Sequence, residues 1–231
     1  MSRLRDLSRS SVGKKAICAA SGLVLLGFVL AHMFANLQIF AGGGRIDAYA
    51  RGLRDAPVLL WSVRAVLAAA FAVHVVVALQ LAARRRAAKG PIPSAQSFLF
   101  PSPPSAGERV RVRGVRNPRA MLVSGVVLAV FVVVHLANLT WGIWHPSFVP
   151  LAVHHNLVAL FRVRAWSAFY LVALAALAIH AAHGAWSAPQ SLGLLPERGA
   201  PGLRRLARGA ALAVATGLFA VVVAVLVGGV R

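Results

Sequence analysis

The stretch AICAASGLVLLGFVLAHMFANLQIF (residues 16–40) decides the fold of this chain. It carries no acidic or basic residue, and it exceeds the roughly 20 residues that a helix needs to cross the hydrocarbon core of a bilayer. A single histidine, His32, lies deep inside it. Ionisable side chains are rare and costly inside a membrane, and they mark a functional site by default. The stretch therefore predicts a membrane-spanning helix with a functional imidazole.

Four further apolar stretches predict an all-α membrane protein with five transmembrane helices. Hydrophobic residues make up 59% of the 231 residues and charged residues only 13%, which is more apolar than a soluble domain of this size can bury. We expect a single transmembrane domain over residues 1–231. Its helices are predicted at about 14–40, 58–83, 118–141, 164–186 and 206–227, with a short interfacial helix at 46–54. A Pro- and Ser-rich cytoplasmic linker is expected at about 87–115, most biased at 90–110.

The basic residues are distributed unevenly between the loops. With the N-terminus inside, 18 of the 25 lysines and arginines fall on cytoplasmic segments. The positive-inside rule therefore places the N-terminus in the cytoplasm and the C-terminus outside. This placement explains the net charge of +20 without a nucleic-acid partner, and it suits anionic lipid or a partner subunit on the inner face. No cleavable signal peptide is expected.

Four of the five stretches carry one deep histidine each: His32, His74, His135 and His180. Helical rise places His32 and His135 ~24 Å and ~22 Å from the cytoplasmic ends of their helices, and His74 and His180 at ~14 Å and ~9 Å. Neutral imidazole binds iron, and helix bundles hold metal cofactors between facing helices. The depths predict four helices forming a bundle around two b-type haems. His32 and His135 would bind the outer haem, and His74 and His180 the inner one, with the irons roughly 10–15 Å apart.

Three side chains near helix ends are candidates for contacts with haem propionates or a quinone: Arg64, Arg119 and His183. Each also has a simpler interpretation. Arg64 can snorkel to the headgroups, Arg119 fits the positive-inside pattern, and His183 can be a solvated interfacial side chain.

Several other features favour or exclude a function. The loop histidines are interpreted as ordinary outer-loop residues; they are His145, His154 and His155. Small residues near the deep histidines, such as Gly22 and Gly125, would leave room for porphyrin faces, although close helix packing explains them equally well. The single cysteine, Cys18, excludes a disulfide framework, a CxxCH haem attachment and iron–sulfur ligation. No nucleophile triad, phosphate loop or intramembrane carboxylate is present in the sequence, so no catalytic residue is expected.

The segments that hold these residues resemble the cytochrome b membrane anchor of succinate dehydrogenase and fumarate reductase, in its single-chain, five-helix, di-haem form. The similar segments are SSVGKKAICAASGLVLLGFVLAHMFANLQIF (10–40), DAPVLLWSVRAVLAAAFAVHVVVALQL (55–81), NPRAMLVSGVVLAVFVVVHLANLT (117–140) and HHNLVALFRVRAWSAFYLVALAALAIHAAHGAWSAPQSLGL (154–194). They cover most of residues 10–195, and the last segment is the most specific. The fifth helix fits in position and character only.

This resemblance implies ligands from the first four helices, the first paired with the third and the second with the fourth. His180 is preferred to His183 because the family's ligand precedes an HG-x-W segment, which is 183–186 here. The resemblance further implies a non-catalytic electron-transfer subunit in a bacterial cytoplasmic membrane. A flavoprotein with covalent FAD and an iron–sulfur subunit would dock on the inner face, and menaquinone or ubiquinone would be the substrate. The direction, succinate oxidation or fumarate reduction, stays open. Some family members carry a glutamate near the fourth ligand, and this chain has none near Ala178.

Two other functions remain open from the residues alone. One is a di-haem cytochrome b of another membrane dehydrogenase, such as one that oxidises formate or hydrogen. The other is a haem-free transporter or assembly protein that uses the histidines for protons or metal.

Overall fold

The computed structural model describes residues 10–88, 118–195 and 201–230, and these are almost entirely helical. Seven α-helices and one 3-10 turn are found there, with no β-strand in these ranges. Five of the helices are long and apolar enough to cross a membrane. The predicted multi-pass, all-α architecture is therefore confirmed. The biased linker at 90–110 lies outside the described residues.

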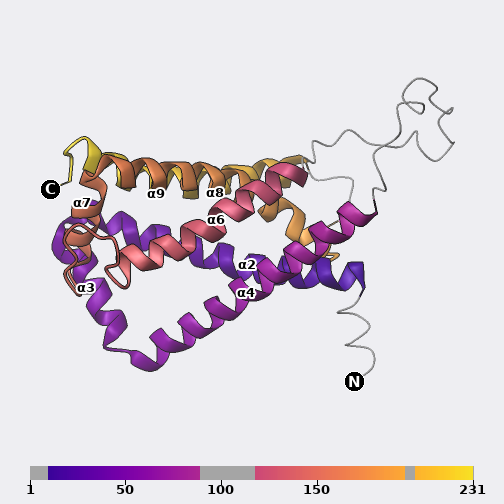
Figure 1. The fold of residues 1–231 in the computed structure, drawn as a ribbon, viewed down its shortest axis with the longest axis horizontal. Coiled ribbons are helices and arrows are strands. Elements are labelled where there is room, and N and C mark those ends of the chain that lie inside the picture. The colour runs from indigo at the N-terminus through magenta and orange to yellow at the C-terminus, as the bar shows by residue number, and fades with distance from the viewer. Residues whose placement is uncertain (1–9, 89–117, 196–200, 231) are drawn as a thin grey trace.

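The helices follow the chain in a simple order (Figure 1). The membrane-length helices are α2 (Ser11–Leu37, continued by the 3-10 turn η1 at Gln38–Ala41), α4 (Pro57–Ala87), α6 (Pro118–Leu139), α8 (Arg164–Ser191) and α9 (Pro201–Leu226). Two shorter helices, α3 (Gly43–Arg54) and α7 (Val153–Arg162), lie together at one end of the long helices. The sequence predicts that this end faces outward.

Local sequence explains where the first two long helices begin and end. α2 begins before the predicted residue 14 because the Ser10 side chain caps it, accepting a hydrogen bond of 2.9 Å from the Gly13 N–H. α4 has Pro57 in its first turn, where the missing N–H costs nothing. It ends in three consecutive arginines, whose charges favour the carboxyl end of a helix dipole.

Two other helices extend beyond their predicted ends. α8 continues past residue 186 to Ser191 and includes Pro189 in its last turns, where a proline removes only one backbone hydrogen bond. α9 begins at Pro201 rather than at 206, so its first turns carry basic residues and only the remainder is apolar.

The helices α2, α4, α6 and α8 form a four-helix bundle. α2 packs along both α4 and α8, and α6 packs mainly along α8. This arrangement places α2 and α6 at opposite corners of the bundle, and α4 and α8 at the other two. α9 lies outside the bundle against α8 and α2, as Figure 1 shows for the α8–α9 pair.

α9 docks by close packing of small residues against a flexible side chain. A Cβ atom added at Gly217 would lie 2.6 Å from the Met33 Sδ atom on α2. Glycine at this position lets the two helices approach each other. One turn further along, α9 contributes Val221 and Val222 to a buried cluster with Tyr170 and Leu174 of α8. The best-packed core of the molecule therefore lies between α7, α8 and α9.

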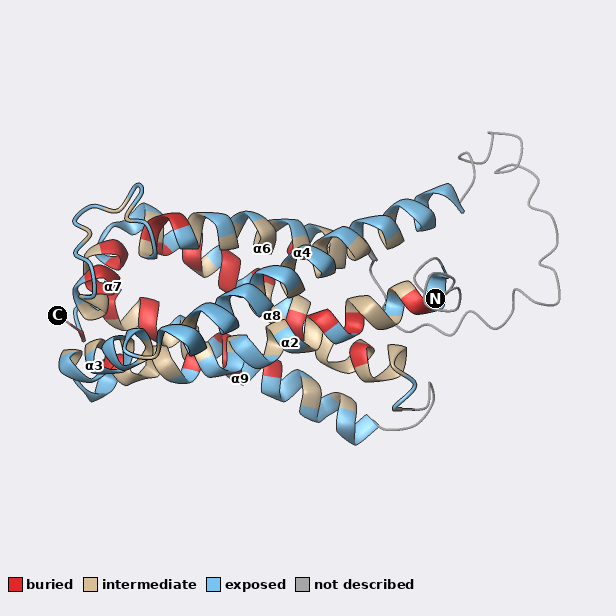
Figure 2. Cartoon of the chain, turned by 90° about the horizontal axis from the view of Figure 1, so that it is seen from below, coloured by how far each residue is buried: buried red, intermediate tan, exposed pale blue. Residues whose placement is uncertain are grey.

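α4 is packed far more loosely than the other long helices. No residue of α4 is fully buried, whereas buried residues occur along α2, α8 and α9 (Figure 2). Its contact with α6 is slight compared with its contact with α2. The bundle is consequently open between α4 and α6, and it encloses a large internal space.

The helix α7 was not expected, because the whole segment 142–163 reads as an outer loop. The structure corrects this: the second half of the segment is an amphipathic helix whose apolar side chains are buried, including Leu157, Leu160 and Phe161. The interfacial helix predicted at 46–54 is present as α3, and it meets α7. The Asp47 Oδ1 atom accepts a hydrogen bond of 2.9 Å from the His154 N–H at the start of α7. The two short helices therefore close the outer end of the bundle.

Candidate functional site

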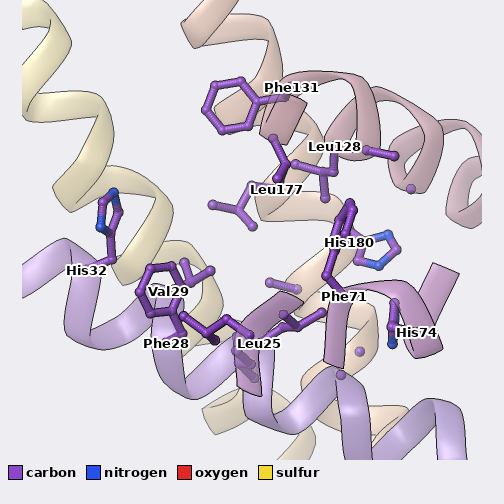
Figure 3. A pocket seen from close by; sticks show the side chains of 18 of the residues that line it. Leu25, Phe28, Val29, His32, Phe71, His74, Leu128, Phe131, Leu177 and His180 are labelled. Carbon is purple, nitrogen blue, oxygen red and sulfur yellow. The ribbon is translucent and has the colours of Figure 1, made fainter. Parts of the chain in front are cut away.

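A cavity of about 1740 Å³ runs through the four-helix bundle. Its wall is mainly apolar and includes all four deep histidines. Figure 3 shows His32 on one side of the cavity and His74 with His180 on the other, with Leu25, Phe28 and Leu177 among the side chains between them. Pockets for single drug-sized ligands usually measure about 300–1,000 Å³. The cavity is therefore large enough for two bulky groups at different levels.

The outer histidines face each other across the cavity. The ring centroids of His32 on α2 and His135 on α6 are 5.7 Å apart, with the ring planes at 85°. Phe28 stacks on His32 and Phe131 packs beside His135, each with centroids 5.4 Å apart. The Tyr170 hydroxyl of α8 lies 3.4 Å from the His135 Nδ1 atom.

The inner histidines form a second pair of the same kind. The ring centroids of His74 on α4 and His180 on α8 are 6.2 Å apart, with the ring planes at 72°. These are the two pairs that helical rise joins from sequence. Because α2 and α6 lie at opposite corners, and α4 and α8 likewise, each pair crosses the bundle diagonally.

Hydrogen bonds identify which nitrogen of the inner histidines carries the proton. The His74 Nδ1 atom lies 3.0 Å from the Cys18 carbonyl oxygen of α2. A carbonyl oxygen can only accept, so Nδ1 must carry the hydrogen and the Nε2 lone pair is free. The His180 Nδ1 atom lies 3.2 Å from the Ser124 Oγ atom of α6, and that hydroxyl lies 3.3 Å from the Met121 carbonyl oxygen, to which it donates. The Ser124 oxygen is then an acceptor for His180 as well.

The dimensions of both pairs fit bis-imidazole ligation of one metal. An imidazole nitrogen binds a first-row metal ion at about 2 Å, so two imidazoles on opposite sides have ring centroids roughly 6 Å apart. The observed separations of 5.7 Å and 6.2 Å match this value. Metal-bound histidines usually donate their other ring N–H to a carbonyl or a similar acceptor, as His74 does. A pair supplies two ligands only, which suits iron whose remaining positions are filled by a macrocycle.

The other predicted site residues are distributed differently. Arg64 lines the cavity from α4, and its guanidinium lies over the Trp61 ring at 5.0 Å from the centroid. His183 also lines the cavity, one turn beyond His180. Arg119 is exposed at the start of α6 and does not line the cavity within the described residues. The structure therefore brings two of these three candidates to the site.

Of the three histidines predicted in the outer loop, only His145 lies in a loop, whereas His154 and His155 lie in the first turn of α7. The His145 Nε2 atom donates to the Asn156 carbonyl oxygen at 2.9 Å, and its Nδ1 atom accepts from the Ser147 N–H at 3.1 Å. His155 hydrogen-bonds through Nε2 to the carbonyl oxygen of Ser147, at 3.0 Å. Both nitrogens of His145 are occupied in this way, so it has no lone pair for a metal.

Sequence reasoning missed several groups at the site. Lys15, Arg85, Ser187 and Gln190 also line the cavity. Ser21 and Ser124, which contact the inner histidines, were also missed. A signal for them exists: a Ser-Gly step stands eleven residues before the outer histidine in both α2 and α6.

Comparison with protein-family models, with characterised proteins and with solved structures finds no match to this chain. The function therefore has to be argued from the membrane architecture, the paired histidines and the sequence pattern.

Proposed function

We propose that this protein is a di-haem cytochrome b. His32 and His135 are the axial ligands of an outer haem b, and His74 and His180 are those of an inner haem b. The observation that carries the proposal is the presence of two diagonal imidazole pairs, at 5.7 Å and 6.2 Å, on the wall of one large apolar cavity. A haem held in this way supplies a reversible one-electron carrier.

The residues of the chain would bind the two irons, hold the two haems apart and surround them with apolar side chains. His74 is held as the Nδ1–H tautomer, so Nε2 is the nitrogen available to iron. On α2 the outer ligand stands eleven residues after Ser21, which contacts an inner ligand, and eleven residues of helix rise by roughly 16 Å. Apolar side chains line the interval between the two levels, including Leu25, Phe28 and Leu177. The two levels together favour electron movement between the two membrane faces.

We further propose that the protein is the membrane anchor of a succinate:quinone oxidoreductase in a bacterial cytoplasmic membrane. The support is the sequence resemblance over residues 10–195. The inner end of the bundle collects basic side chains from α2, α4 and α9: Lys14, Lys15, Arg84, Arg85, Arg86, Arg204, Arg205 and Arg208. An iron–sulfur subunit would dock there and carry the FAD-containing flavoprotein. Membrane quinone would be the other electron partner, and dicarboxylate chemistry would belong to the soluble subunits.

Purification of the intact complex in mild detergent tests this proposal. A pyridine haemochrome assay should find two haem b per chain, and the flavoprotein and iron–sulfur subunits of succinate dehydrogenase should co-purify. Protein without haem, despite ample porphyrin supply, would reject the cytochrome. Two haems with the subunits of a formate or hydrogen dehydrogenase would reject only the anchor assignment.

A further inference from the structure

Two short segments, one on α2 and one on α6, contact the inner histidines in the same way. Each consists of a residue whose carbonyl oxygen accepts a hydrogen bond, a serine three residues later and a glycine directly after it: Cys18, Ser21 and Gly22 on α2, and Met121, Ser124 and Gly125 on α6. We call them the α2 seat and the α6 seat. The ring of His74 rests on the α2 seat and the ring of His180 on the α6 seat.

The glycine of each seat provides clearance for an imidazole ring. A Cβ atom added at Gly22 would lie 3.0 Å from the His74 Cε1 atom and 3.3 Å from Nδ1. A Cβ atom added at Gly125 would lie 3.3 Å from the His180 Cε1 atom and 3.8 Å from Nδ1. Among residues 10–88, 118–195 and 201–230, no other side chain comes within 4 Å of either added atom. Glycines that serve helix packing would instead face the backbone or apolar side chains of a neighbouring helix, as Gly217 faces Met33.

The serine and the carbonyl of each seat set the direction of the hydrogen bonds. The Ser21 Oγ atom donates to the Ile17 carbonyl oxygen at 2.8 Å, so its lone pairs are left for His74 Nδ1 at 3.4 Å, next to the closer Cys18 carbonyl oxygen. On α6 the serine itself is the partner: the Ser124 Oγ atom donates to the Met121 carbonyl oxygen at 3.3 Å and lies 3.2 Å from the His180 Nδ1 atom. Each seat therefore accepts a hydrogen bond from Nδ1–H, which leaves the Nε2 lone pair available as a ligand.

The spacing along the helix links each seat to the outer pair. Eleven residues make about three helical turns, so Ser21 and His32 share one face of α2, and Ser124 and His135 share one face of α6. Each of the two helices thus contributes a ligand at the outer level and a seat at the inner level.

From this we propose that the α2 and α6 seats are positioning elements for the inner haem. They hold His74 and His180 in the Nδ1–H tautomer and in a fixed ring orientation, and they thereby set the affinity and potential of that haem. The outer haem does not depend on them. This inference rests on the proposed cytochrome function, and it deepens that function by separating the determinants of the two haems.

The test compares glycine variants within one helix. Gly22→Ala and Gly125→Ala place a methyl group against an inner ring, whereas Gly27→Ala on α2 has nothing within 4 Å of the new atom and does not line the cavity. Loss of a group that orients a metal ligand typically costs about 10- to 100-fold in metal affinity. We expect Gly22→Ala and Gly125→Ala to lower the inner-haem affinity by at least about tenfold. The low-spin ferric EPR signal of the inner haem that these variants still bind should shift. Gly27→Ala should match the wild type.

A serine variant provides a milder test of the same proposal. Ser124→Ala removes a single hydroxyl group. Without this acceptor for its Nδ1–H, the His180 imidazole becomes a weaker electron donor to iron. The inner midpoint potential should therefore rise, while the outer potential stays constant. Unchanged inner haem in Gly22→Ala, Gly125→Ala and Ser124→Ala, or equal loss of both haems in these three variants, would overturn the role of the seats. A wild-type protein without haem would instead reject the proposed function. The seats would then be judged in that protein by nitrogen-15 NMR, which should report the Nδ1–H tautomer of both inner histidines in the wild type.

Discussion

His74 on α4 donates its Nδ1–H to the Cys18 carbonyl oxygen on α2, at 3.0 Å. The bond joins a deep histidine to the backbone of the neighbouring helix. It explains how an imidazole in an apolar interior has its polar N–H satisfied. It also leaves Nε2 directed away from α2. The chemistry proposed for the cavity depends on this free nitrogen and on its counterparts in the other three histidines.

Replacing the deep histidines should remove the haems in pairs. His32→Ala and His135→Ala are each expected to lose the outer haem, because a single imidazole leaves the iron without its second strong ligand. His74→Ala and His180→Ala should each lose the inner haem. Potentiometric titration of the α-band resolves one component for each haem. The two variants of one histidine pair should lack the same component. His155→Ala is the matched control, since this exposed histidine in the first turn of α7 should leave both haems bound. Four unrelated spectral losses would contradict the pairing.

The Tyr170 hydroxyl should tune the outer haem alone. It lies 3.4 Å from the His135 Nδ1 atom, and with Nε2 on iron the Nδ1–H would donate to the phenolic oxygen. Tyr170→Phe removes this acceptor and should raise the outer midpoint potential while the inner one stays constant. The loss of one buried hydrogen bond should also cost about 0.5–1.5 kcal/mol of stability. Redox titration with both haems resolved checks the first effect, and an unchanged outer potential would exclude a role for Tyr170.

The contact between α9 and α2 should be sensitive to added volume at Gly217. A valine there would collide with the Met33 side chain, whose Sδ atom lies 2.6 Å from the position of a Cβ atom. Overpacking of this kind typically costs about 1–3 kcal/mol. Thermal unfolding in detergent should show Gly217→Val destabilised, and Gly209→Val, at a position with open space, close to the wild type. Adding Met33→Ala to Gly217→Val should recover part of the loss. No recovery would show that the two residues do not interact.

The outer end of the bundle should depend on the carboxylate of Asp47. Its Oδ1 atom accepts from the His154 N–H and joins α3 to α7. Asp47→Ala leaves that N–H without its partner, and the expected cost is about 1.5–3 kcal/mol for a hydrogen bond to a charged group. Hydrogen exchange over residues 153–162 should accelerate, with Asp55→Ala, at the opposite end of α3, as the control. Asp47→Asn keeps an acceptor oxygen and should fall between the wild type and alanine.

Much of the architecture was predictable because a bilayer imposes its rules locally. Each span depends on the length of one uncharged stretch, so the five helices follow from composition along the chain. The depth of each histidine follows from helical rise alone, and similar depths are enough to join His32 with His135 and His74 with His180. The outer ends were harder to predict. α7 is only ten residues long, and its apolar face is buried by α8 and α9. The sequence of α7 alone does not indicate that these two helices pack against it.

By itself, then, the sequence determined how many helices cross the membrane and at which levels the imidazoles lie, because both depend on distances along a single helix. Only the tertiary structure decided which helix lies beside which. That choice placed Gly22 under His74 and Gly125 under His180, and it set α9 against α2 rather than over the open side between α4 and α6. The reason is physical: lateral packing depends on side chains from two helices at once, and lipid offers every apolar face an equally good alternative.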